Sequence, residues 1–108
     1  MNVEDIKAIE LLEPWCLTKP GLESELAREV SSEHPLSGKR AIAVARRGDC
    51  DDVLFFLPDG PSPLAVVHLA WGSRREQSPQ LPWTVFYSSL QDWIERCMKP
   101  DHASLQGE

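Results

Sequence analysis

The chain has 108 residues, with 11 Lys and Arg against 17 Asp and Glu, which gives a formal net charge of −6. A chain of this length builds one hydrophobic core, so we expect a single domain over residues 1–108. The acidic balance argues against nucleic acid as a partner, because phosphate binding depends on neutralisation by Lys and Arg. No apolar run is longer than five residues, so we expect no segment that spans a membrane.

The N-terminus and the cysteines indicate a cytoplasmic location. Residues 1–5 are acidic at Glu4 and Asp5, where a signal peptide would be basic and then apolar. The cysteines are odd in number and form neither a disulfide framework nor a CxxC site; they are Cys16, Cys50 and Cys97. We expect three small, partly buried thiols and no cofactor.

Two helices are predicted at the start of the chain. Val3 to Leu12 repeats an apolar residue at every third position, and Pro14 would end this helix. Gly21 to Ser32 repeats leucine and valine every fourth residue, and Pro35 follows it. Residues 1–33 carry eight acids and three bases, so most of the negative charge is expected on the solvated faces of these helices.

Antiparallel strands are predicted next, separated by turn residues at 48–49 and 58–61. The expected strands are Ala41–Arg47, Asp52–Leu57, Leu64–Trp71 and Trp83–Tyr87. A long loop, 72–82, joins the last two of them.

A last helix is predicted over Leu90 to Met98, capped by Ser88 or Ser89. Pro100 is expected to end it, which leaves residues 101–108 as a frayed tail. The predicted fold class is α+β, with an antiparallel sheet of about four strands, two N-terminal helices and one C-terminal helix. Continuous apolar strands are usually covered on both faces, and three helices are few for that, so an uncovered sheet face could form a homodimer.

An acidic run, Asp49-Cys50-Asp51-Asp52, follows the basic pair Arg46 and Arg47. Hard cations need several carboxylates that converge on one point, whereas Asp51 and Asp52 are adjacent and should point to opposite faces of a strand. Asp49 and Asp51 could share a face, but two ligands are few. The sequence therefore predicts no metal site, and turn formation with ion pairs to the arginines is the simpler interpretation.

His68 interrupts the otherwise apolar strand Leu64–Trp71. By alternation it shares a face with Leu64 and Val66. An imidazole at this position could act as a general base together with Asp51 or Asp52. The alternative is a half-buried histidine that is hydrogen bonded to one of these aspartates across the strands.

Tryptophan and arginine side chains bracket the loop before the last strand. Trp and Arg are enriched at the energetic centres of protein interfaces, although a tryptophan at a strand end can equally be a packing residue. The binding candidates are therefore Arg47, Asp49, His68, Trp71, Arg74, Arg75 and Trp83.

Three segments, RRGDCDDVLF at 46–55, AVVHLAW at 65–71 and SLQDW at 89–93, resemble the motifs of a group of small bacterial proteins of unknown function. In that group we expect R-x-D-N-D-D-V-L-F and V-V-H-L-T-W. The resemblance covers about residues 33 to 102 and implies no activity. Cys50 stands here where the group has Asn, and Ala70 where it has Thr. The outline is also similar to that of small bacterial immunity proteins.

Two functional hypotheses follow. The first is a binding module that acts through protein–protein contact, of an immunity or antitoxin kind, since the chain is small and acidic and shows no assembled catalytic set. The second is a small hydrolase or metal-dependent enzyme that uses His68 with Asp51 and Asp52. A subunit of a larger assembly is a third alternative.

Overall fold

The computed structural model describes residue 6 and residues 8–69 and 83–106. Within these residues a five-stranded antiparallel sheet has its strands in chain order from one edge to the other. The strands are β1 (Trp15–Leu17), β2 (Ile42–Arg47), β3 (Asp52–Phe56), β4 (Leu64–His68) and β5 (Thr84–Tyr87). The helices are α2 (Leu22–Glu29), α3 (Leu90–Trp93), the π-helical turn η1 (Ile94–Met98) and α4 (Lys99–Gln106). The α+β class is as predicted.

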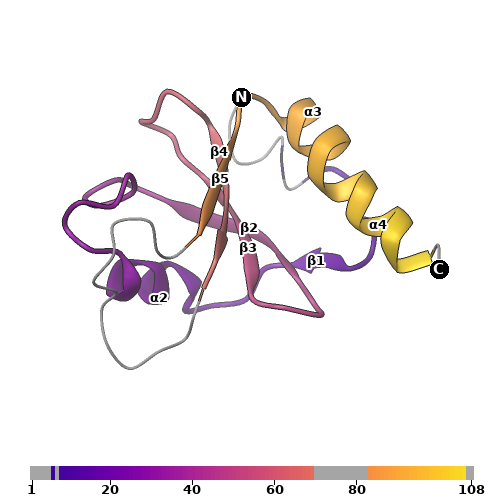
Figure 1. Ribbon diagram of the computed structural model, residues 1–108, viewed down its shortest axis with the longest axis horizontal. Coiled ribbons are helices and arrows are strands. Elements are labelled where there is room, and N and C mark those ends of the chain that lie inside the picture. The colour runs from indigo at the N-terminus through magenta and orange to yellow at the C-terminus, as the bar shows by residue number, and fades with distance from the viewer. Residues whose placement is uncertain (1–5, 7, 70–82, 107–108) are drawn as a thin grey trace.

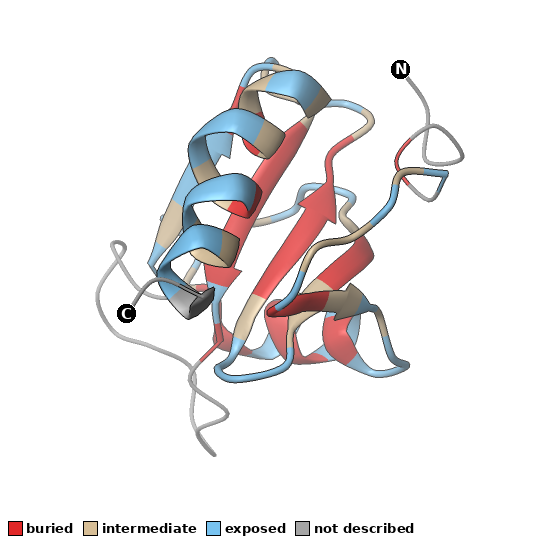
Figure 2. Ribbon diagram, turned by 90° about the vertical axis from the view of Figure 1, so that its right-hand side faces the viewer, coloured by how far each residue is buried: buried red, intermediate tan, exposed pale blue. Residues whose placement is uncertain are grey.

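Helices lie on both sides of the sheet. In Figure 1 the continuous rod of α3, η1 and α4 lies to one side of the strands and α2 to the other, and Figure 2 shows that rod running along buried strand segments. One buried cluster joins Leu54 and Val66 to Trp93 and Met98 of the rod. A second joins Phe55 and Val67 to residues of α2. Because side chains alternate along a strand, β3 and β4 feed both clusters, which explains their unbroken apolar runs.

The four predicted strands correspond to β2, β3, β4 and β5, and the shift of register between Ala43 and Ala45 is a bulge in β2. The sequence analysis missed β1. Its three residues are too few to show an alternating pattern, and it is defined by its pairing with β2, for example Cys16 with Arg46. The number of strands was therefore predicted one too low.

The first predicted helix does not extend to Leu12. Residues 8–12 form a turn and irregular chain, while residues 1–5 and 7 lie outside the described part. Ile9 and Leu12 still pack against the cluster that contains Trp93. Their three-residue spacing therefore indicated a partly buried side of the chain correctly, although residues 13–14 form a turn into β1 and do not continue a helix.

The C-terminal helix does not end at Pro100. Residues 101–106, expected as a tail, continue it as α4. The turn before Pro100 is π-helical, and the Lys99 N–H bonds to the Ile94 carbonyl five residues back. Pro100 therefore follows a π-helical turn inside a continuous helix, and this local change in hydrogen bonding accompanies the proline without ending the helix.

Within the described ranges, no helix is both long enough and apolar enough to cross a lipid bilayer.

Candidate functional site

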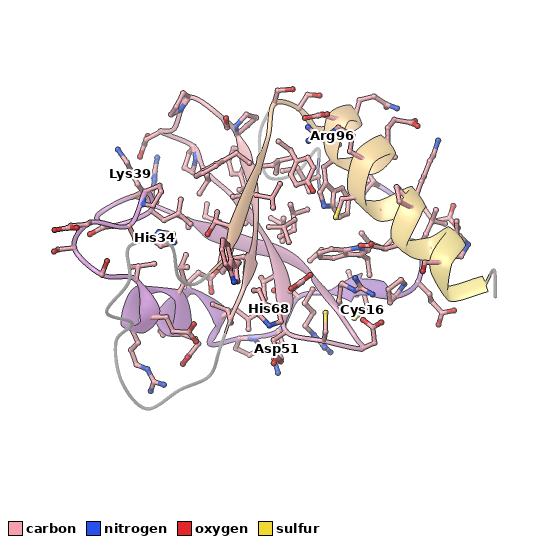
Figure 3. All side chains as sticks on the ribbon, in the orientation of Figure 1. Cys16, His34, Lys39, Asp51, His68 and Arg96 are labelled. Atoms are coloured by element: carbon pink, nitrogen blue, oxygen red, sulfur yellow. The ribbon has the colours of Figure 1, made fainter. Side chains whose placement is uncertain are left out.

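The predicted site residues of β3 and β4 lie at one end of the sheet, on the face that carries α3, η1 and α4. Asp52 begins β3 and is paired in register with His68, the last residue of β4. Both share the face of Leu54 and Val66, as alternation from Leu64 predicts. Trp83 follows at the sheet edge, where its carbonyl accepts the His68 N–H at 2.9 Å. Figure 3 shows His68 at this lower end of the strands, with Asp51 below it.

His68 and Asp52 form the closest side-chain contact of this region. Nδ1 of His68 lies 2.7 Å from Oδ1 of Asp52, and the histidine side chain is about half exposed. When Nδ1 carries the proton and donates it to Asp52, Nε2 is left as a base on the solvent side. A histidine oriented by a carboxylate can accept a proton from a substrate, which is the general-base half of a catalytic centre.

The rest of a catalytic centre is not assembled around His68 in the described part of the chain. Asp51 does not join the pair: it precedes β3, its side chain is exposed, and its carbonyl accepts the N–H of Leu69. No group of three or more His, Cys, Asp and Glu side chains that could hold a metal converges within residues 8–69 and 83–106. Of the two aspartates proposed as partners of His68, only Asp52 reaches it.

Arg47 and Asp49 serve a structural contact at the β2–β3 turn. Nε and Nη2 of Arg47 donate to the two carboxylate oxygens of Asp49 at 2.9 and 2.8 Å, and Nη1 lies 3.5 Å from Asp101 of α4. The hydrogen bonds from Arg47 hold the pKa of Asp49 below its ordinary value. This is the ion pairing that the sequence predicted, extended to a helix that the sequence did not place there.

The turn also borders a hollow with a volume of about 420 Å³. Arg46, Asp49, Cys50 and Asp52 line it together with Lys19. Burial raises the pKa of the Cys50 thiol, which lowers the share of reactive thiolate at neutral pH. The hollow is therefore polar and salt-bridged, and it brings no activated nucleophile to the Asp52–His68 pair.

A different kind of surface lies along β5. Three large apolar side chains are exposed here: Trp83 by 63%, Val85 by 48% and Phe86 by 39%. β5 pairs with β4 along one side, and no strand of the described part pairs along its other side. Edge strands are normally protected by charge or proline, yet Thr84–Tyr87 contains neither.

Trp83 was among the predicted binding residues, whereas Val85 and Phe86 were missed. The available signal was the sequence TVFY itself. Thr84 is its one small polar residue, no charge alternates with its apolar residues, and it is the last strand of the predicted meander. The other predicted binding residues, Trp71, Arg74 and Arg75, lie outside the described residues.

Comparison of the chain with protein-family models, with curated proteins and with solved structures finds no match. The resemblance carried by the 46–55 and 65–71 segments therefore stays an expectation.

Proposed function

We propose that this protein is a binding module that recognises another protein through the edge of β5. The observation that carries the proposal is the exposure of Trp83, Val85 and Phe86 on an edge strand that has neither charge nor proline. An extended segment can add to such an edge by main-chain hydrogen bonds, while side chains on the strand give affinity and selectivity. Tryptophan and phenylalanine are also common centres of binding energy.

The two sides of β5 support the same proposal. Thr84 lies 3.3 Å from Nε2 of the buried His34, and Tyr87 is buried beneath Arg96, whose guanidinium carbon is 5.2 Å from the ring centroid. The strand is thus held at both ends, while Val85 and Phe86 between them face solvent on opposite sides of the sheet. A preorganised edge loses little conformational entropy when a partner binds.

The test is affinity capture with three immobilised proteins: the wild type, Val85→Lys and Leu17→Lys. Leu17 is 75% exposed on the opposite edge strand, so its lysine variant is the matched control. We expect wild type and Leu17→Lys to retain a common bound protein that Val85→Lys loses, because a lysine on the edge disfavours strand addition. Identical bound sets for all three proteins, measured by quantitative mass spectrometry, would overturn the proposal.

A second candidate function, proton-transfer catalysis by His68, is favoured by its 2.7 Å contact with Asp52. The test is hydrolysis of p-nitrophenyl acetate by wild type, His68→Ala and His102→Ala. His102 is the matched control because its Nδ1 is also hydrogen bonded, at 2.7 Å, but to the backbone carbonyl of Glu13 and not to a carboxylate. Loss of hydrolysis in His68→Ala alone supports catalysis, and equal rates in all three proteins exclude it.

A further inference from the structure

A small hollow lies beside β5 on the face that carries α2. Its volume is about 240 Å³, enough for one apolar side chain rather than a large ligand. The residues that define its chemistry are Leu36, Leu57, Phe86, Lys39, Arg40 and Asp59. Phe86 is thus both a wall of this hollow and an exposed residue of the edge strand.

A buried histidine positions one wall of the hollow. His34 is 4% exposed, its Nδ1 accepts the Leu36 N–H at 3.0 Å, and its Nε2 lies 3.3 Å from Oγ1 of Thr84. These contacts fix the 34–36 segment against β5, so the distance between the Leu36 wall and the Phe86 wall is set by the fold. The hollow therefore exists before any partner arrives, which lowers the cost of filling it.

The rim of the hollow is positive on a protein that is negative overall. Nη2 of Arg40 lies 3.3 Å from Oδ1 of Asp59, and both side chains are largely exposed. In the described part of the chain, the ammonium of Lys39 has no ion-pair partner. The three charges sum to +1 on a chain whose net charge is −6. A carboxylate is the group that this rim complements.

The register of the sheet links the hollow to the edge. Phe86 is paired with Ala65, which belongs to the α2-side cluster, so the residue of an added strand that lies opposite Phe86 would point to that same side. The hollow lies on the β4 side of Phe86, because Leu57 and Ser62 also line it, so that side chain would reach the hollow over the Phe86 ring while its backbone pairs with β5.

From these placements, and resting on the proposed function, we infer that β5 and the hollow bind the C-terminus of a partner protein. The last residue supplies an apolar side chain to the hollow and its α-carboxylate to Lys39. A C-terminal residue carries both groups on one Cα, which fits a single small hollow with a cation at its rim. In an internal segment, the nearest acidic residue on the same side of the strand would be two positions from the apolar residue, about 6–7 Å along the chain. Its carboxylate would therefore start farther from the hollow than the α-carboxylate of a last residue does.

The experiment uses a library of random heptapeptides displayed with free C-termini, selected on the full-length protein. The best peptide is then synthesised with a free carboxylate and as the C-terminal amide. Binding of both forms is measured by fluorescence anisotropy to wild type, Lys39→Gln and Lys99→Gln. Lys99 is the control lysine, since it pairs with Glu95 on the far helix at 2.9 Å.

We expect selected peptides to end in an apolar residue and the acid form to bind wild type and Lys99→Gln about tenfold more tightly than the amide, as one charge-assisted contact contributes. Lys39→Gln should bind both forms with the affinity of the amide, and its circular dichroism should match the wild type. Absence of selected peptides, no preference at the last position, or equal binding of acid and amide would overturn the inference. If these results occur while Val85→Lys still loses its captured protein, the proposed function stands and only the C-terminal recognition fails.

Discussion

The two edges of the sheet, β1 and β5, each carry a tryptophan but use it in opposite ways. Trp15 of β1 is 1% exposed, meets Trp93 edge to face at a centroid distance of 5.2 Å, and donates from Nε1 to Asp101 at 2.8 Å. Trp83, immediately before β5, is mostly exposed. The residue type is the same, and the C-terminal helix decides the difference because it packs over Trp15.

Asp101 and His102 attach the C-terminal helix to the Trp15 end of β1. Asp101 contacts the indole N–H of Trp15 and the guanidinium of Arg47, and His102 binds the Glu13 carbonyl just before β1. Among the described residues, the contacts that hold β5 are made by Thr84 and Tyr87 at its ends. The C-terminal helix thus covers the Trp15 end of β1, although Leu17 at the other end of that strand is exposed, whereas Val85 and Phe86 of β5 are both exposed.

The largest difference in stability is expected between the alanine variants of the two tryptophans. Trp15→Ala should lower the free energy of unfolding by about 3–5 kcal/mol, because it leaves a cavity and unpairs Asp101. Trp83→Ala should change it by less than about 0.5 kcal/mol. Urea denaturation followed by far-UV circular dichroism measures both. Similar losses in the two variants would show that the edges do not differ.

The next prediction concerns the pH dependence of stability at Glu25 of α2, which belongs to neither edge strand. Burial, followed by the hydrogen bond and charge of Glu29, raises the pKa of Glu25 from 4.5 to about 7, although Arg28 pairs with it at 2.8 Å. The folded state then holds a proton that the unfolded chain releases above pH 4.5, so stability should fall as pH rises from about 4.5 to 7 and level off above.

Glu25→Gln removes this dependence and should stabilise the protein at pH 8 by up to about 3 kcal/mol. Urea titrations at pH 5 and pH 8 make the measurement, with Glu23→Gln on the same helix as the comparison variant. A wild-type stability that rises between those two pH values would contradict the assignment. Neither variant should alter capture of a partner through β5.

A smaller loss is expected when the helix is released from β1. Asp101→Ala should cost about 1–2 kcal/mol, since Trp15 Nε1 and Arg47 both lose an acceptor. Glu95→Ala breaks only the exposed pair with Lys99 and should cost less than about 0.5 kcal/mol. Thermal denaturation of the two variants measures the difference. Equal midpoint temperatures would mean that the contacts of Asp101 do not stabilise β1.

The smallest effect on stability is expected at β5. Val85→Lys should leave the unfolding free energy within about 0.5 kcal/mol of the wild type, because the side chain it replaces is half exposed. Its consequence should be confined to binding. A loss of 2 kcal/mol or more, measured by the same urea titration, would mean that Val85 is a packing residue and that β5 is not an open edge.

Local sequence predicted much of the framework. The strands at 42–47, 52–56, 64–68 and 84–87 follow from β-branched residues bounded by Gly, Pro and Asp turns, and the short turns set an antiparallel register. That register is why the pairing of His68 with an aspartate of the neighbouring strand could be predicted. The choice of Asp52 rather than Asp51 then follows from the alternation of side chains.

Other features depended on partners distant in sequence. β1 exists because Cys16 pairs with Arg46, and its three residues carry no pattern of their own. Asp101 lies 86 positions from Trp15, so neither residue predicts the other. Pro100 indicated a helix end, but the helix continues through it after a single π-helical turn, and that turn has no sequence signature.

The sequence by itself determined an α+β chain with an antiparallel meander, because alternation, turn residues and amphipathic spacing are local properties. The tertiary structure decided at which edge of that meander the tryptophan is buried. Burial of a strand edge depends on where a helix from the other end of the chain packs, and here Asp101 brings α4 to Trp15 while Val85 and Phe86 stay in solvent. The exposed edge on which the proposed function rests is therefore a consequence of helix packing, which no local pattern encodes.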